Sequence, residues 1–303
     1  MAIPTARYSE TATVKIDYEK CKACGLCVKV CKGAPLYLEN NKVKIDQTRY
    51  FGCIGCGHCV AVCPTGAIAV EGRDITQTSF IDIPVEETRA GYEELMALML
   101  ARRSVREFED RGVEQEKIDK ILAAASTAPM GIPPSDVEVL VIKGKEKVRE
   151  FSDDMLKLIK SQKWIFSKPV LLLMRPFMKR EEYEVVDKFM YPAIEAFEEM
   201  RKENTDYLLY EAPLAMYFHV SPYADPADPL ITATYAMLAA ETLGLGSCMI
   251  GTIGPMLKSG GKEVKEKYGI NIRNQPGIVV IFGYPAVKYR RAIRRNLAQV
   301  HYY

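Results

Sequence analysis

Eight of the nine cysteines in this chain form two runs of nearly identical spacing. In each run two residues separate the first three cysteines from one another, and three residues separate the third from the fourth. A tight loop of this kind can turn three thiolates toward one cuboid iron-sulfur cluster, whereas the fourth thiolate comes from elsewhere in the fold. The pattern predicts electron transfer through 4Fe-4S clusters, with these candidate ligands: Cys21, Cys24, Cys27, Cys31, Cys53, Cys56, Cys59 and Cys63.

The two runs resemble those of bacterial-type ferredoxins, in which the fourth cysteine of each run ligates the other cluster. The resemblance implies that Cys63 completes the set of Cys21, Cys24 and Cys27, and that Cys31 completes the set of Cys53, Cys56 and Cys59. Lys32 follows Cys31 where Pro64 follows Cys63, so the turn after the first run is expected to differ. The alternatives are a zinc site, which needs only four ligands, and a disulfide framework, which is typical of secreted chains.

Short strands are expected beside the cysteine runs. Residues 12–17 and 43–46 alternate apolar and polar side chains, and residues 67–70 follow the second run. These segments predict a duplicated unit of strand, loop and helix. A ferredoxin needs only the first quarter of a chain of 303 residues, so we expect a ferredoxin-like domain at 1–80, a linker at 81–90 and a second domain at 91–303.

The composition describes an ordinary soluble globular protein, with 48% hydrophobic and 26% charged residues. A formal net charge of +2 gives no indication of nucleic-acid or membrane binding. No segment approaches the roughly 18 consecutive apolar residues of a membrane span. Because cluster-bound thiolates need reducing conditions, the expected location is the cytoplasm, and the expected source is an anaerobe.

The second domain opens on a cluster of cations. Arg102, Arg103, Ser104 and Arg106 place three guanidinium groups and a hydroxyl group within five residues, a combination that suits a phosphate. A second basic cluster, residues 290–295, lies near the end of the chain. A solvated helix end and an exposed basic face are the alternatives for these two clusters. If both clusters bind one anion, the two ends of the domain meet.

Helical and extended patterns alternate between these clusters. Helices are predicted from 91 to about 101 and at 114–125, 145–162, 181–203 and 227–243, and strands at 137–142, 169–174, 213–220 and 278–282. A glycine-rich turn at 244–246 leads to residues 249–251. Four strands suffice for one central sheet covered by helices on both faces, so the predicted fold class is α+β.

Four segments of the second domain, taken in order, resemble the FMN-dependent nitroreductase family. The segments are Arg-Arg-Ser-Val-Arg-Glu-Phe at 102–108, Ala-Ala-Ala-Ser-Thr-Ala-Pro-Met-Gly-Ile-Pro-Pro-Ser-Asp at 123–136, Leu-Gly-Leu-Gly-Ser-Cys-Met-Ile-Gly at 243–251, and Phe-Gly-Tyr-Pro at 282–285 with the basic tail. Together with the cysteine runs, the whole chain resembles nitroreductases that carry an N-terminal ferredoxin domain.

The resemblance implies FMN bound at a homodimer interface. Its implied contacts are Arg102, Ser104 and Arg106 for the ribityl chain and phosphate, with Arg103 beside them; Arg291 and Arg295 of the tail; Pro129, Met130 and Gly131 under one face of the flavin; and Gly251 and Thr252 near N5. Ile132-Pro133-Pro134 stands where the family often has a serine and an Asn-Gln pair. The side-chain hydrogen bonds usual in that loop are therefore not expected.

Other reactive residue types have structural explanations. Cys248 is expected to be a small buried apolar residue, and His219 a core histidine with satisfied hydrogen bonds. His58 is expected at the surface or beside a cluster, without ligating it. Aromatic residues at 176–212 fit packed helices better than a lid over the flavin. No catalytic side chain is identifiable.

We therefore expect an iron-sulfur flavoprotein oxidoreductase, in which two 4Fe-4S clusters feed FMN and the flavin reduces a small organic acceptor such as a nitroaromatic, a quinone or a conjugated C=C bond. The expected electron donor is ferredoxin or NAD(P)H. The alternative is an electron-transfer or redox-sensing flavoprotein that has a protein partner and no small substrate.

Overall fold

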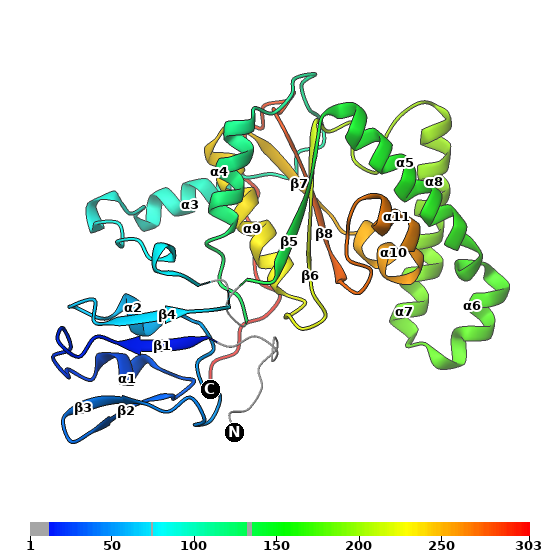
Figure 1. Cartoon of the computed structure of the whole chain (residues 1–303). Helices are drawn as coiled ribbons and strands as arrows, with labels where there is room; N and C mark the ends of the chain where they lie inside the picture. The colour runs from blue at the N-terminus through cyan, green and yellow to red at the C-terminus, as the bar shows by residue number, and fades with distance from the viewer. Residues whose placement is uncertain (1–11, 74, 132–134) are drawn as a thin grey trace. The chain divides into compact units, whose positions relative to one another are not determined.

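The computed structural model describes residues 12–73, 75–131 and 135–303 (Figure 1). The chain folds into two compact units. The first contains residues 1–89 with two short segments, 129–136 and 222–228, and the second contains residues 90–128, 137–221 and 229–303. The main division, between Arg89 and Ala90, falls at the end of the segment that we predicted to be a linker.

The first unit consists of two copies of a short helix and the strands beside it. Its elements are β1 (Thr13–Ile16), α1 (Leu26–Val30), β2 (Leu36–Glu39), β3 (Lys42–Ile45), α2 (His58–Ala61) and β4 (Ile68–Glu71), followed by two short helical turns, η1 (Gln77–Ser79) and η2 (Glu86–Thr88). β1 pairs antiparallel with β4, and β2 pairs antiparallel with β3. Each predicted strand is present, and β2 is an additional one. Val14, Leu36, Val43, Ile68 and Val70 form the core between the two sheets.

A four-stranded antiparallel sheet forms the centre of the second unit, in the order β5-β6-β8-β7 (Figure 1). The strands are β5 (Val137–Lys143), β6 (Leu214–Val220), β7 (Gly246–Ile250) and β8 (Gln275–Gly283). Every residue of β6 is buried, which explains its unbroken apolar sequence. Ala215 and Tyr217 point to one face, and Leu214, Met216 and Phe218 to the other.

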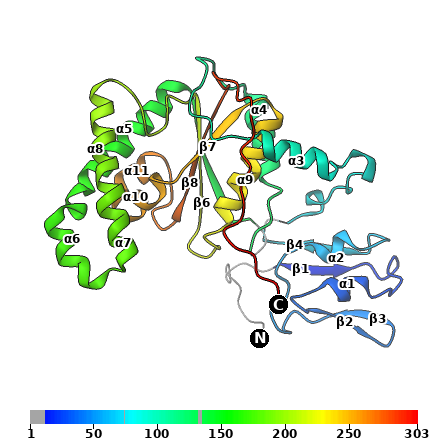
Figure 2. The same cartoon turned by 180° about the vertical axis from the view of Figure 1, so that it is seen from behind.

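Helices cover both faces of this sheet (Figures 1 and 2). One face carries α5 (Lys145–Gln162), α8 (Tyr191–Lys202), α10 (Ile253–Gly260) and α11 (Lys262–Lys267). The other face carries α4 (Gln115–Ala125) and α9 (Asp228–Thr242). α5 and α4 are amphipathic, and their buried residues, such as Phe151, Met155, Ile118 and Ile121, belong to the two cores. The expected α+β class, a central sheet flanked by helices, is confirmed.

One predicted strand is wrong. Residues 169–174 lie in a helix, α6 (Lys168–Met174), and the fourth strand of the sheet is β7 instead. A short apolar run does not distinguish a strand from a helix, and Pro169 in the first turn favours the helix. Leu172 and Leu173 are 63% and 76% exposed, whereas Leu171 between them and Pro169 is buried, so this run has one buried face, as a helix does. The helical region continues through η3 (Lys163–Phe166), η4 (Arg175–Phe177), α7 (Arg180–Val185) and η5 (Val186–Met190).

α3 (Tyr92–Ala101) leads into the arginine cluster and has no buried residue. The spacing of Tyr92, Leu95, Met96 and Met99 predicts one apolar helix face, but Tyr92, Leu95 and Met99 are exposed and Met96 is half-buried. Within the described segments of the chain, no helix combines the length and apolar character needed to cross a bilayer.

Candidate redox site

Two cavities in the first unit each bring together four cysteines. One is lined by Cys21, Cys24, Cys27 and Cys63, and the other by Cys31, Cys53, Cys56 and Cys59. Each set takes three thiols from one loop and one from the other loop. The structure thus groups the cysteines in the crossed pairing that the ferredoxin resemblance implied.

Left-handed backbone in both loops makes this grouping possible. Gly25 and Gly57 cap α1 and α2 with φ of 74° and 71°. Two residues earlier, Ala23 and Gly55 also have positive φ, 53° and 72°. Left-handed residues turn the chain sharply, so successive cysteines face a common centre rather than alternate sides. The left-handed conformation costs conformational free energy at Ala23, which has a Cβ, and little at Gly55, which has none.

The cysteines around each cavity do not close on a single ion. Among the described residues no set of three His, Cys, Asp or Glu side chains forms a site for a single metal ion. Four thiolates around zinc would lie about 2.3 Å from a common centre, whereas these cysteines stand around a cavity. A four-iron cluster, which is bound by thiolates at its corners, fits that arrangement.

Burial makes free thiolates unfavourable in these cavities. Burial, with the thiolates of Cys53, Cys31 and Cys56, raises the pKa of Cys59 to about 12. Burial also raises the pKa of Cys27, with smaller effects from Cys21 and Cys24. Positive charge, which iron supplies, would stabilise the thiolates of Cys27 and Cys59 that burial disfavours.

The turns after the two runs differ, as predicted, although they share two features. Gly66 N donates a 3.3 Å hydrogen bond to Cys63 O, whereas the described residues contain no equivalent bond to Cys31 O. Ala34 and Gly66, each three residues after the fourth cysteine, both have φ of 60°. The next carbonyl accepts an equivalent hydrogen bond in each copy, from Asp46 N to Pro35 O and from Asp17 N to Ala67 O, both 2.8 Å long. The turn that contains Pro64 is therefore closed by a backbone hydrogen bond, and the turn that contains Lys32 is open.

In the second unit the arginine segment joins the edge of the sheet. Ser104 pairs with Ser247 of β7, and Val105 N donates a 3.0 Å hydrogen bond to Ser247 O. A few residues on, Glu109 N donates to Tyr284 O at 2.8 Å. Gly246 packs against Val105 so closely that an added Cβ would lie 2.6–2.9 Å from the valine side chain. Segments from the start, the end and the glycine-rich turn of the unit thus meet.

Several buried polar atoms of the second unit, at this junction and beyond the other end of β7, lack a partner among the described residues. They are Arg102 Nη1, Ser247 Oγ and Thr252 Oγ1. Buried polar groups without partners are rare in native proteins and indicate an absent ligand or water. The donor set of a guanidinium and two hydroxyls fits a phosphate and a polyol chain, which are the polar parts of FMN.

Cys248 is buried between the core and the arginines. Only 1% of it is exposed, and burial raises its pKa while Arg106, Ser104 and Arg102 oppose that rise. The thiol is therefore poorly accessible, as expected for a small core residue. Arg106 itself is exposed and lies over the ring of Tyr210, with 5.6 Å from Cζ to the centroid.

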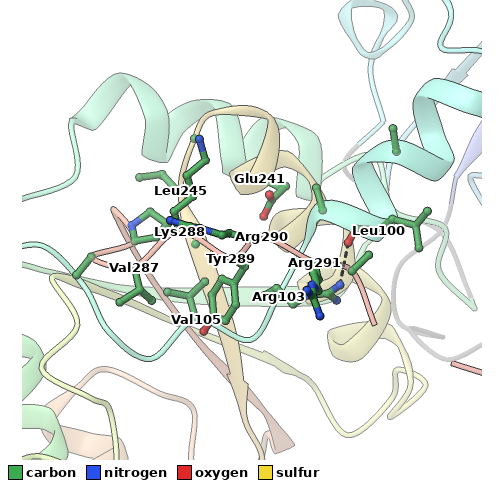
Figure 3. Close-up of a pocket in the computed structure, with 17 residues that line it drawn as sticks. Leu100, Arg103, Val105, Glu241, Leu245, Val287, Lys288, Tyr289, Arg290 and Arg291 are labelled. Carbon is green, nitrogen blue, oxygen red and sulfur yellow. Dashed lines mark hydrogen bonds between the residues drawn. The ribbon is translucent and has the colours of Figure 1, made fainter. Parts of the chain in front are cut away.

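Arg103 points into a different environment from Arg102. Its guanidinium donates to Leu100 O at 3.1 Å and to Arg102 O at 3.0 Å, which caps the end of α3. With Glu241, Tyr289 and Arg291 it lines an open cavity of about 730 Å³ (Figure 3). Burial raises the pKa of Glu241, and the charges of Arg102 and Arg103 oppose that effect. Arg291 and Arg103 thus share one cavity, whereas Arg295 lies in the exposed tail.

The other predicted flavin contacts lie apart from this cluster in the chain. Pro129, Met130 and Gly131 belong to the first unit, where Gly131 N donates to Asp228 Oδ1 at 3.1 Å. Residues 132–134, the departure from the family loop, lie outside the described residues. Gly251 is exposed, and Thr252 caps the start of α10.

Ser247 and Glu241 lie at the arginine junction but were not among the site residues predicted from the sequence. Each has a sequence signal that could have identified it. Ser247 directly follows the Gly244-x-Gly246 turn, and Glu241 is the only charged residue of α9 after its first residue. An acidic residue on an otherwise apolar helix indicates a partner cation. The expectation for His219 is met: it is 3% exposed, and its Nδ1 lies 2.9 Å from Asn274 Nδ2.

Comparisons with known proteins agree with both units. Residues 13–76 match a 4Fe-4S dicluster domain, and residues 99–284, more than half of the chain, match the nitroreductase family. A relative from Bacillus subtilis (strain 168), named FMN reductase (NAD(P)H), is 29% identical over 160 residues, which are 53% of this chain and 55% of that protein. The chain thus spans about half the length of that curated relative.

Solved structures share the fold of the second unit. A nitroreductase with bound FMN from Desulfitobacterium hafniense DCB-2 has a TM-score of 0.50 and 22% identity, with 69% of this chain and 97% of that chain covered. A nitroreductase with bound FMN from Bacteroides fragilis NCTC 9343 has a TM-score of 0.50 and 18% identity, with 69% and 99% covered. On the extent of the family match and the shared fold, this chain, with its 4Fe-4S dicluster domain, belongs to the nitroreductase family.

Proposed function

We propose that this protein is an iron-sulfur flavoprotein oxidoreductase that passes electrons from two 4Fe-4S clusters to FMN and then to a small organic acceptor. The observation that carries the proposal is that one chain contains two four-cysteine cavities and a nitroreductase-family unit. The relatives whose structures contain FMN support the choice of flavin.

The residues of the first unit would hold the clusters. Each cavity offers four thiolates, and the left-handed loops fix them before iron arrives. Such preorganisation limits rearrangement when an electron enters, because the ligands are held by the backbone and not by flexible side chains.

The residues of the second unit would hold the flavin. Arg102, Ser104 and Arg106 are assigned to its phosphate and ribityl chain, and the Gly251–Thr252 backbone to the ring near N5. When bound, FMN supplies a centre that accepts single electrons and releases two as a hydride. Arg291 of the tail is assigned to the phosphate with Arg295, whereas Arg103 is assigned to holding the end of α3.

A second copy of the chain is the proposed structural partner. α3 has no buried residue, although Tyr92, Leu95, Met99 and Leu100 lie along it. The tail from Val287 onward is exposed as well and carries Ile293, Leu297 and Val300. Contiguous exposed apolar surface of this kind marks an interface. A homodimer would cover these segments, and light scattering would show twice the chain mass of 34.1 kDa.

The test begins with anaerobic purification and a count of iron and FMN. We expect about eight irons and one FMN per chain, because each cubane cluster contains four irons. Stopped-flow spectra then compare flavin reduction by reduced ferredoxin with reduction by NADH or NADPH. A Cys59→Ala variant should slow reduction by ferredoxin and leave direct hydride reduction unchanged.

Turnover with acceptors completes the test. Nitroaromatics, quinones and conjugated enones should each be tried as oxidants of the reduced flavin, in the cytoplasm-like reducing buffer that the clusters need. Rapid flavin reduction with no oxidation by any of these acceptors would contradict the enzyme proposal and indicate a relay to a protein partner. An iron count well below about eight per chain would contradict the two-cluster assignment.

A further inference from the structure

The two cysteine runs are copies whose equivalent residues can be compared one by one. Thirty-two residues separate equivalent positions such as Cys31 and Cys63, and the same offset relates β2 to β4 and the start of α1 to that of α2. The residues that follow the fourth cysteine differ: Lys-Gly-Ala-Pro follows Cys31, and Pro-Thr-Gly-Ala follows Cys63. The ligand spacing is therefore the same in both copies, and the residues that surround the fourth thiolate are different.

Two groups donate to Cys63. The N–H of Ala67 lies 3.2 Å from Cys63 Sγ, and the hydroxyl of Thr65 lies 3.7 Å from it. Both residues also line the cavity of Cys21, Cys24, Cys27 and Cys63. A cluster-bound thiolate has no proton, so in a loaded site the Thr65 hydroxyl is the donor.

Neither counterpart can donate to Cys31. Pro35 stands in the place of Ala67 and has no N–H, and Gly33 stands in the place of Thr65 and has no hydroxyl. Both line the cavity of Cys31, Cys53, Cys56 and Cys59. A side chain at Gly33 is excluded by its surroundings, since an added Cβ would lie 2.2 Å from Gly52 O.

The two turns share other features, although only the turn after Cys63 is closed by a backbone hydrogen bond, from Gly66 N to Cys63 O. Ala34 and Gly66 share a φ of 60°, and the carbonyls of Pro35 and Ala67 accept equivalent hydrogen bonds. Each cavity also has a cation beside it. Lys22 lines the cavity that contains Cys63, and the positive charge of Arg73 favours the thiolate of Cys53 in the other cavity. The copies thus differ mainly in the hydrogen bonds to sulfur and in solvent, because Cys24 is exposed and no cysteine of the other set is.

We propose that Ala67 and Thr65 make the two clusters unequal, so that the cluster on Cys63 has the higher reduction potential and accepts the first electron. This inference rests on the proposed loading of both cavities with 4Fe-4S clusters. Each cluster gains one electron on reduction and so becomes more negative. Hydrogen-bond donors and solvent stabilise that form. The cluster on Cys31 then receives the second electron and is the first to return one, which gives the pair a fixed order.

Three variants test the roles of these positions. Thr65→Val keeps the shape of the side chain and removes the hydroxyl, Ala67→Pro removes the N–H, and Pro35→Ala supplies an N–H to the other copy. Pro35 occupies the equivalent position in the other copy, and its carbonyl accepts the same kind of hydrogen bond as that of Ala67, so proline can be placed here. None of the three variants replaces a cluster ligand, so each changes only the hydrogen-bond donors beside a ligand.

The measurement is an anaerobic dithionite titration of the full-length protein, followed by EPR of the reduced clusters, after iron has been counted. Wild type should show two separate midpoints. Thr65→Val and Ala67→Pro should lower the upper midpoint and leave the lower one in place, and Pro35→Ala should raise the lower midpoint. Each variant should retain about eight irons.

The outcomes separate this inference from the proposed function. Wild-type protein with fewer than about eight irons contradicts the cluster assignment itself and with it the inference. Eight irons with one shared midpoint, or a Thr65→Val variant that moves only the lower midpoint, overturns the inference and leaves the cluster assignment standing. If Ala67→Pro fails to load iron, Thr65→Val and Pro35→Ala still decide the result.

Discussion

The cysteine cavities and the arginine junction show two ways of assembling a site. In the first unit, three members of each set lie within one short loop, and left-handed residues at Ala23, Gly25, Gly55 and Gly57 turn them to one side. In the second unit, Ser104 and Ser247 lie far apart in the chain and meet only because β7 forms the edge of the sheet. The first site depends on local conformation, and the second depends on the packing of the whole unit. Substitutions should therefore disturb the two sites in different ways.

Loss of one cluster ligand should have the largest effect. Cys59→Ala removes a thiolate from the Cys31 cavity, and we expect the loss of about four irons per chain. FMN content should stay near one per chain, since the second unit has its own core. Cys248→Ala is the matched control, because Cys248 is buried in β7 and lines neither cysteine cavity. Equal iron loss in the two variants would show that the units do not load independently.

The two neighbouring arginines should separate flavin binding from helix capping. Arg102→Met removes a half-buried side chain whose buried Nη1 has no partner among the described residues, so FMN affinity should fall without loss of stability in the FMN-free protein. A charge-assisted hydrogen bond contributes about 1.5–3 kcal/mol, which corresponds to a roughly tenfold to hundredfold weaker Kd.

Arg103→Met is the control, since Arg103 donates to Leu100 O and Arg102 O. It should lower stability by about 0.5–1 kcal/mol and weaken FMN binding less. Calorimetric titration of the FMN-free protein with FMN measures the affinities, and urea unfolding measures the stabilities. Equal loss of affinity in the two variants would mean that Arg103 also reaches the flavin.

Gly246 tests whether packing alone positions the arginine segment. Gly246→Ala would place a methyl group within 2.6–2.9 Å of Val105, next to Ser104. We expect a loss of about 1–3 kcal/mol in the free energy of unfolding, together with weaker FMN binding. Gly112→Ala is the control, because nothing lies within 4 Å of the added Cβ. Urea unfolding followed by circular dichroism gives the comparison, and unchanged FMN affinity in Gly246→Ala would show that the segment adjusts.

His219 should produce the smallest effect, a dependence of stability on pH. Burial lowers the pKa of His219, with Lys265 acting in the same direction and Glu138 against it. The unfolded chain therefore binds a proton near pH 6.5 while the folded chain does not, so stability falls as the pH drops through that value, by at most about 1.4 kcal/mol per pH unit. Unfolding at pH 7.5 and 5.5 measures the change. His219→Gln should reduce it, and an identical pH dependence in that variant would assign the effect to other groups.

The sequence predicted most of the helices and the strands with strong alternation or long apolar runs. It misplaced residues 169–174, because a run of apolar residues satisfies a helix and a strand equally and only burial distinguishes them. It also missed β7, whose first residues resemble a turn. The difference expected at Lys32 is present, since a backbone hydrogen bond closes the turn after Cys63 and the described residues contain no equivalent after Cys31. The left-handed conformation of Ala34 was not visible in the sequence, because it is unfavourable for alanine.

By itself the sequence determined the candidate cluster ligands, since cysteine spacing within a loop is a local property and the backbone has few ways to satisfy it. It also indicated the arginines as anion ligands, but it could not tell Arg102 from Arg103. Only the tertiary structure decided that Arg102 Nη1 is buried without a partner among the described residues while Arg103 caps α3, and that Ala67 and Thr65 reach the sulfur of Cys63. Such differences depend on which atoms neighbour a side chain after folding, and the chain brings those atoms together from positions that share no local pattern.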